Sequence, residues 1–149
     1  MKYFTIEELC QSETADKLKI DNTPSEEIKK NLEILGDCLL DPLREAWGSP
    51  IIINSGYRCP ILNKAVGGSK TSSHMSGWSV DMRPKNGKME EFKKFVIDFI
   101  KTKDAEVNIP KKLDKFNNFL KPALIIATSL EVVALNVFSS QAPQSFAYG

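Results

Sequence analysis

A histidine and an aspartate seven positions apart are the residues of this chain best suited to metal chemistry. His74 is the only histidine among the 149 residues, and Asp81 follows it across Gly77. On a helix, residues seven positions apart lie about 10 Å from each other along the axis, and the glycine interrupts a helix, so the two side chains cannot meet on one helix. They meet if His74 ends a loop and Asp81 lies on the strand that follows. An imidazole and a carboxylate placed in this way are two of the protein ligands that zinc uses.

The residues around Asp81 follow the pattern of a strand with one face in the core. Apolar and polar positions alternate there, with Trp78, Val80 and Met82 set between Ser79, Asp81 and Arg83. Successive side chains of a strand point to opposite faces, so Asp81 lies on the face away from the apolar residues. Residues 64–73, rich in Gly, Ser and Thr, predict the loop that brings His74 to this strand.

A helix and a second strand lead up to the site. One apolar stripe with steps of three and four predicts a helix buried against the core, and it comprises Ile28, Leu32, Leu35, Leu39, Leu43 and Ala46. Thr23 followed by Pro24 predicts its N-cap, and Pro42 predicts a kink or pause near residues 40–41. After Gly48, residues 50–54 predict a short buried strand. The sequence Ser-Gly-Tyr-Arg follows this strand and ends at Arg58.

The sequence predicts two more helices in the first two thirds of the chain. Thr5 and Glu8 form a capping box at the start of a short helix near the N-terminus. A second amphipathic pattern follows the Asn86-Gly87 turn and comprises Met89, Phe92, Phe95, Val96, Phe99 and Ile100. Aromatic residues at this spacing predict a helix packed on the core.

Composition indicates one globular domain of ordinary make-up. The chain is 42% hydrophobic and 26% charged, and its formal net charge of +1 gives no reason to expect nucleic acid or an acidic membrane as partner. We expect a monomeric chain. The three cysteines, Cys10, Cys38 and Cys59, have no CxxC spacing, so they predict neither a disulfide framework nor a zinc ribbon and fit a reducing compartment.

No export signal is visible at the N-terminus, where glutamates stand in place of an apolar run. The longest apolar run, residues 123–138, is too short to span a bilayer and contains Glu131. We therefore expect the chain to be cytoplasmic when it is synthesised. An action on an extracytoplasmic substrate would follow release or export by another route.

The composition changes after Lys121. Residues 122–149 carry one charged side chain, Glu131, whereas the preceding part carries all other charges of the chain. The shift predicts a boundary between a main unit, residues 1–121, and an atypical apolar tail, residues 122–149. Within the tail, residues 124–127 and 132–138 are candidate strands, although their periodicity also allows a helix.

Four phrases in order carry a resemblance to a known family. They are YFTIEEL, SETADKLKIDNTP, LDPLREAWGSPIIINSGYRCPILNKAVGG and SSHMSGWSVDM. From residue 3 to about residue 120, the chain resembles the phage and prophage branch of the zinc D-alanyl-D-alanine carboxypeptidase family. The resemblance implies an α+β fold of the hedgehog and DD-peptidase type, with a small antiparallel sheet, helices packed on it, and C-terminal strands that depart from the family pattern.

The resemblance also implies a function and a set of site residues. The function is zinc-dependent hydrolysis of peptide bonds in the stem peptides of bacterial peptidoglycan, by a carboxypeptidase or an endolysin-type endopeptidase. His74 and Asp81 match the first two zinc ligands of the family. Arg58 matches the residue that holds a substrate carboxylate or the developing oxyanion, and Ser72 and Gly77 match residues that shape the ligand loop, with Ser72 next to the substrate.

The chain departs from this family at two places. The family has a third ligand, a second histidine on a C-terminal strand that reads Trp-x-His, and this chain has no second histidine. The family also tends to have an aspartate where this chain has Asn117, which cannot ionise. Two protein ligands make a poor zinc site.

Three explanations of the missing ligand are open. Glu131 or Cys59 could replace the histidine, since zinc accepts carboxylate and thiolate. The chain could be a catalytically inactive member that binds cell-wall peptide through Arg58 and the ligand loop. The third explanation is a frameshift in the gene, which would also account for the change of composition in the tail.

The frameshift makes a prediction about the gene. Glu131-Val132-Val133-Ala134-Leu135 is encoded by GAR GTN GTN GCN CTN, and reading one base later permits Arg-Trp-Leu-His-Leu. Under this explanation, the nucleotide sequence across codons 115–149 contains Trp-x-His in the shifted frame. A shifted frame without this motif would exclude the frameshift.

Overall fold

The described elements of this protein form an α+β fold, as predicted. The computed structural model describes residues 1–105, 124–128 and 133–137. A four-stranded antiparallel sheet has the strand order β1-β2-β4-β3. Its strands are β1 (Ile51–Ser55), β2 (Ser79–Pro84), β3 (Leu124–Thr128) and β4 (Val133–Val137). The two candidate strands of the C-terminal segment are therefore confirmed, and both belong to this sheet.

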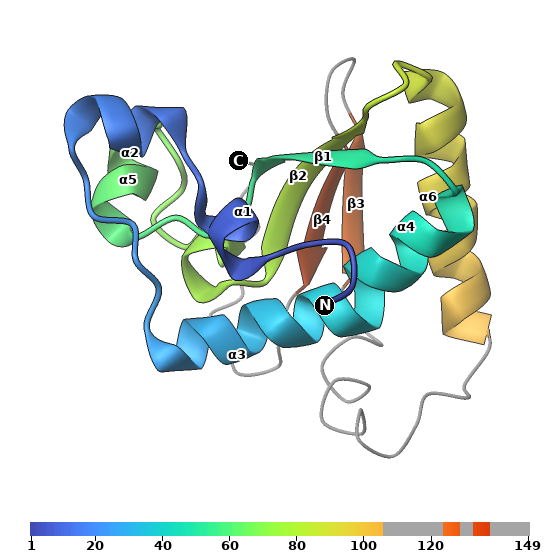
Figure 1. The fold of residues 1–149 in the computed structure, drawn as a ribbon, viewed down its shortest axis with the longest axis horizontal. Coiled ribbons are helices and arrows are strands. Elements are labelled where there is room, and N and C mark those ends of the chain that lie inside the picture. Colours follow the sequence, from blue (N-terminus) through green and yellow to red (C-terminus); the bar gives the residue numbers. More distant parts are fainter. Residues whose placement is uncertain (106–123, 129–132, 138–149) are drawn as a thin grey trace.

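The helices lie on one side of the sheet and at its two ends (Figure 1). They are α1 (Ile6–Cys10), α2 (Glu13–Leu18), α3 (Glu26–Leu35), the π-helical turn η1 (Gly36–Leu40), α4 (Asp41–Trp47), α5 (Pro60–Ala65), the 3-10 turn η2 (Ser73–Ser76) and α6 (Met89–Ala105). In Figure 1, α3 and α4 run along the sheet, α6 stands at one end, and α2 and α5 form the other end. None of the helices in these ranges is long and apolar enough to cross a bilayer.

The long helical region from α3 to α4 is interrupted where the sequence predicts a pause. The π-helical turn η1 ends at Leu40, and Pro42 lies in the first turn of α4, where a missing N–H costs little. The start of α3 differs from the prediction. Its N-cap is Ser25, whose hydroxyl accepts a hydrogen bond from the Ile28 amide, because the Thr23 hydroxyl is used in a local bond to Asp21.

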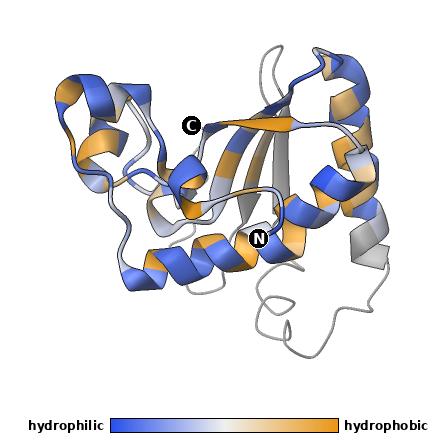
Figure 2. Cartoon of the chain, in the orientation of Figure 1, coloured by the Kyte–Doolittle hydropathy of each residue, from blue (hydrophilic) through white to orange (hydrophobic). Residues whose placement is uncertain are grey.

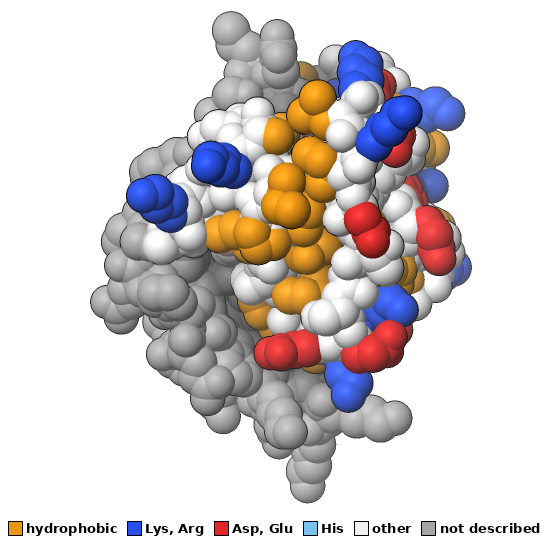
Figure 3. Space-filling model, turned by 90° about the vertical axis from the view of Figure 1, so that its left-hand side faces the viewer, with side chains coloured by type: hydrophobic (Ala, Val, Ile, Leu, Met, Phe, Trp, Pro, Cys, Tyr) orange, Lys and Arg blue, Asp and Glu red, His pale blue; other side chains and the backbone are white. Residues whose placement is uncertain are grey.

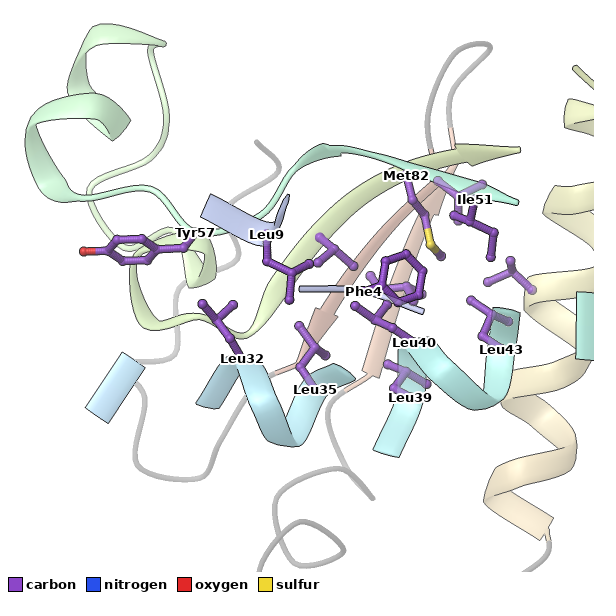
Figure 4. Close-up of a cluster of buried hydrophobic side chains, with 14 of the residues drawn as sticks. Phe4, Leu9, Leu32, Leu35, Leu39, Leu40, Leu43, Ile51, Tyr57 and Met82 are labelled. Atoms are coloured by element: carbon purple, nitrogen blue, oxygen red, sulfur yellow. The ribbon is translucent and has the colours of Figure 1, made fainter. Parts of the chain in front are cut away.

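Leucines from the helices form the core with the inner face of β2. Leu32, Leu35, Leu40 and Leu43 are fully buried, and Figure 2 shows how hydrophobic residues alternate with hydrophilic ones along α3 and α4. Their side chains meet Phe4, Leu9 and Met82 in one cluster (Figure 4). Burial of one such side chain stabilises a fold by about 1.5–3 kcal/mol, so this cluster fixes β2 against α3.

The register of the sheet separates a core face from a second face. Val80 and Met82 of β2 pair with Leu135 and Val133 of β4, and all four side chains are fully buried. Asp81 lies between them in the sequence and pairs with Ala134, so both residues belong to the opposite face. The predicted alternation along β2 is therefore confirmed.

The face of the molecule where α2 and α5 lie carries a band of hydrophobic side chains. Figure 3 shows this band with charged residues around it. The large hydrophobic side chains that remain exposed in the described ranges include Leu18 of α2 and Ile61 of α5. Single exposed apolar residues are common on protein surfaces. A substitution at one of these two residues can therefore be compared with the same substitution in the core.

The packing of β4 on β2 makes a prediction for stability. Leu135→Ala should lower the free energy of unfolding by about 2–5 kcal/mol, because it removes a fully buried side chain from the sheet. Leu18→Ala, the same change at a side chain that is 58% exposed, should cost less than about 0.5 kcal/mol. Urea denaturation of both variants measures the difference. Equal effects would mean that β4 does not pack on β2.

Candidate active site

The turn η2 presents His74 at the start of β2. The Ser72 hydroxyl caps this turn by accepting a hydrogen bond from the His74 amide at 3.3 Å. Gly77 ends the turn with a φ of 77°, and a Cβ atom there would lie 3.2 Å from a side-chain carbon of Ile28 in α3. Asn31 of α3 also donates a hydrogen bond to the Ser76 carbonyl at 2.8 Å. Helix α3 thus fixes the turn that carries the histidine.

A single carbonyl sets the orientation of the imidazole. His74 Nδ1 lies 2.7 Å from the carbonyl oxygen of Gly56, and because a carbonyl only accepts, Nδ1 carries the proton and donates it. The other ring nitrogen, Nε2, lies 3.5 Å from Asp81 Oδ2. This is the arrangement of a metal-binding histidine, whose second nitrogen donates to a carbonyl or carboxylate. The structure therefore brings together the two side chains that the sequence singled out.

The carboxylate of Asp81 is held without full hydrogen bonding. Its Oδ1 atom is buried and has no hydrogen-bond partner among the described residues. The lone pairs of Oδ2 and Nε2 face each other at 3.5 Å, and a cation bound between the two atoms would remove their repulsion. The two atoms are therefore candidate ligands for a metal ion.

Arg58 lies beside this pair and is tied to the same loop. Its backbone amide donates to the His74 carbonyl at 3.1 Å, and its Nη2 donates to the Ser72 hydroxyl at 3.3 Å. Arg58 is buried, and its Nε has no hydrogen-bond partner among the described residues. Burial lowers the pKa of this guanidinium, and the negative charge of Asp81 opposes that shift. A buried, charged donor group with an unused N–H is suited to bind a carboxylate or an oxyanion.

Asn22 holds the segment that carries Arg58, and nothing in the sequence pattern identified it. Its side-chain amide donates to the carbonyls of Cys10 and Tyr57 at 2.8 and 3.0 Å, and its Oδ1 accepts from the Cys59 amide at 2.7 Å. These bonds join residues that are far apart in the chain, so no local spacing predicts them. Asn22 clamps both sides of Arg58 to the N-terminal region.

Cys59 is engaged in a helix start and does not join the two metal-binding candidates. Its Sγ accepts a hydrogen bond from the Leu62 amide at 3.5 Å and caps α5. Within the described ranges, no group of three or more His, Cys, Asp or Glu side chains gathers around one point. Cys59 as a replacement ligand is therefore not supported, and the other two residues on which the sequence analysis relied, Asn117 and Glu131, lie outside the described residues.

The position beside Asp81 on β4 is held by alanine. Ala134 is the direct partner of Asp81 and shares its face of the sheet. Catalytic zinc sites use three protein ligands and keep a further position for water. The described residues fit two of these ligands, His74 and Asp81, and do not supply the third. The residues that the structure describes thus offer two of the three protein ligands that such a site needs.

A cleft opens next to Arg58. It has a volume of about 490 Å³ and lies between the edge strand β1 and the turn that joins α1 to α2. Residues of β1 line it on one side, and Arg58 and Arg83 also reach it. The two guanidinium groups give this cleft positively charged walls, with Glu13 as the acidic residue that lines it.

Comparison with known proteins supports one family. A sequence model of the Peptidase M15 family matches residues 2–112. The match includes Arg58, Ser72, His74 and Asp81 and ends before β3 and β4. No curated protein and no solved structure matches the chain.

The close approach at Gly56 makes a prediction for His74. A Cβ atom on Gly56 would lie 2.1 Å from the Leu9 carbonyl oxygen, so Gly56→Ala should displace the backbone that accepts the imidazole proton. Because the chain has one histidine, a long-range proton–nitrogen NMR spectrum shows this ring alone. We expect the slowly exchanging Nδ1–H signal of the native protein to be lost in the variant.

Gly67→Ala is the matched control for this substitution. Gly67, unlike Gly56, has a positive φ, and a Cβ atom there would have no neighbour within 4 Å, so the change adds local backbone strain only. The control should keep the imidazole signal of the native protein. An unchanged signal in Gly56→Ala would mean that the carbonyl does not set the ring orientation.

Proposed function

Because the chain belongs to the Peptidase M15 family, we propose that it hydrolyses a peptide bond in the stem peptides of bacterial peptidoglycan in the presence of zinc. The observation that carries the proposal is the pairing of His74 Nε2 with Asp81 Oδ2 at 3.5 Å, next to the buried guanidinium of Arg58. The finer assignment is a D-alanyl-D-alanine carboxypeptidase or an endolysin-type endopeptidase, of the kind that phages and prophages encode.

His74 and Asp81 are the metal-binding residues in this proposal. The Gly56 carbonyl keeps the proton of the imidazole on Nδ1, which leaves Nε2 available as a ligand. Zinc in such a site lowers the pKa of a bound water to about 7 and polarises a carbonyl oxygen. With two described ligands the site should hold zinc weakly, so activity should depend on zinc added to the solution.

Arg58 is the residue that contacts the substrate in this proposal. Its guanidinium binds either the terminal carboxylate of the peptide or the oxyanion that develops on the scissile carbonyl. A preorganised donor at such an oxyanion is worth about 3–4 kcal/mol in related chemistry. Ser72 accepts a hydrogen bond from Arg58 and thereby holds the guanidinium in the loop that also carries His74.

The cleft beside Arg58 suits an extended peptide with acidic groups. Strand β1 lies at the edge of the sheet and lines this cleft with Ile52, Ile53 and Asn54. An edge strand offers unpaired backbone groups to an extended peptide. Stem peptides are short and carry carboxylates, which complement the guanidinium groups of Arg58 and Arg83.

A second candidate function is recognition of the same peptide without hydrolysis. Ala134, which lies opposite Asp81 and offers no metal ligand, favours it. In that case His74 and Asp81 hold no metal, and Arg58 alone anchors the substrate carboxylate. Both candidates use the same residues for recognition and differ in whether the peptide bond is broken.

A test with a defined peptide separates the two candidates. We expect a synthetic stem pentapeptide ending in D-alanyl-D-alanine to be cleaved when zinc is added, and cleavage to stop with a chelator or with His74→Ala. Mass spectrometry identifies the bond, since a carboxypeptidase releases a single D-alanine and an endopeptidase releases a larger fragment. Binding with no cleavage at any zinc concentration would select the second candidate.

The role of Arg58 has its own control within the same test. Arg58→Gln should weaken peptide binding by about tenfold or more, because a hydrogen bond to a charged group is worth about 1.5–3 kcal/mol. Arg44→Gln makes the same change in α4, where the guanidinium stacks 4.6 Å from the centre of the Tyr3 ring and is not among the residues that line the cleft. Equal binding by the two variants would remove Arg58 from the substrate site, and binding by neither variant nor native protein would remove both candidates.

A further inference from the structure

We infer that Ala134 occupies the position from which β4 would supply a third metal ligand, so that the single substitution Ala134→His completes a zinc site. The inference rests on the proposed function in one respect, since it takes His74 and Asp81 as metal ligands. It goes beyond that function by naming the residue at which the site formed by the described part of the chain is incomplete.

The register of β4 selects this position. Asp81 pairs with Ala134, and directly opposed residues of antiparallel strands have Cβ atoms about 4.5–5.5 Å apart on the same face. The positions before and after Ala134 are Val133 and Leu135, which are fully buried on the core face. A side chain on β4 can therefore reach Asp81 directly from position 134, and its two neighbours cannot.

The neighbouring strand on the other side of β2 offers no metal ligand next to Asp81. The partner of Asp81 on β1 is Ser55, and a serine hydroxyl is not among the usual ligands of zinc. The next residue, Gly56, gives its carbonyl to His74 and packs against the Leu9 backbone. A third ligand from a neighbouring strand must then come from β4, where the alanine methyl group offers no donor atom.

An unused carboxylate oxygen also points to a missing component of the site. Asp81 Oδ1 is buried and has no hydrogen-bond partner among the described residues. An unsatisfied buried polar atom costs about 1–3 kcal/mol, and an acceptor oxygen in this state is one that a cation would use. A cation bound by three side chains would use the free carboxylate oxygen.

Zinc binding by designed variants tests the inference. Native protein, Ala134→His and Ala127→His are dialysed against metal-free buffer, and zinc per chain and zinc affinity are measured with a competing chromogenic chelator. Ala127 pairs with Ala134 in the sheet, so Ala127→His places the same imidazole one strand farther from Asp81, by about 4.8 Å.

The expected result is a gain specific to position 134. Ala134→His should retain close to one zinc per chain and bind it at least about 100-fold more tightly than the native protein, since even changes behind the ligands alter affinity by about 10–100-fold. Ala127→His should behave as the native protein does. The gain should disappear when His74→Ala is added to Ala134→His.

Two results would overturn the inference. One is a folded Ala134→His protein that binds zinc no more tightly than Ala127→His. The other is a native protein that already keeps one zinc per chain through dialysis, because its site would then be complete without position 134. Ala134→Cys, a smaller change that brings a thiolate ligand, carries the same expectation if the histidine variant does not fold.

The outcome is distinguishable from that of the proposed function. Zinc affinity is measured without any peptide, so a gain in Ala134→His stands even if no stem peptide is cleaved. Conversely, cleavage by the native protein with added zinc stands even if the substitution brings no gain.

Discussion

The hydrogen bond between the Gly56 carbonyl and His74 is the constraint on which the site depends. It fixes the tautomer of the imidazole and directs Nε2 toward Asp81. The carbonyl is itself held by the approach of the chain to Leu9, whose carbonyl accepts from the Tyr57 amide at 2.8 Å. Only glycine fits at position 56, because any Cβ atom would collide with Leu9. A short N-terminal helix thus controls a histidine 65 positions later.

Strand β2 contributes residues both to the hydrophobic core and to the candidate site. Asp81 lies in the candidate site, and its neighbours Val80 and Met82 are buried among the leucines of α3 and η1. A slip of one residue in register would turn Asp81 into the core and expose the apolar side chains. Packing of the core therefore also determines on which face of the sheet Asp81 lies. The burial of Val80 and Met82 thus sets the geometry of the site.

The sequence predicted the parts of the site that have local patterns. The alternation along β2 and the meeting of His74 with Asp81 followed from period-two spacing. The loop before β2 followed from its Gly, Ser and Thr content, but the prediction for residues 64–65 was wrong, because they belong to α5. The contribution of Asn22 was not predictable, because its three hydrogen bonds join distant parts of the chain. The pairing of Asp81 with Ala134 was not predictable either, since a strand pattern gives the face of a residue but not its partner on another strand.

The site divides into two parts that belong to different segments of the chain. Residues 2–112, which match the Peptidase M15 family, contain Arg58, the residue proposed to bind the peptide, and two candidate metal ligands. Strand β4 lies beyond that match, in the segment where charged residues nearly disappear. The position of Arg58 depends on Asn22, Ser72 and η2, none of which comes from β4. A change in the C-terminal segment can therefore remove a candidate metal ligand while the surface proposed to bind peptide stays intact.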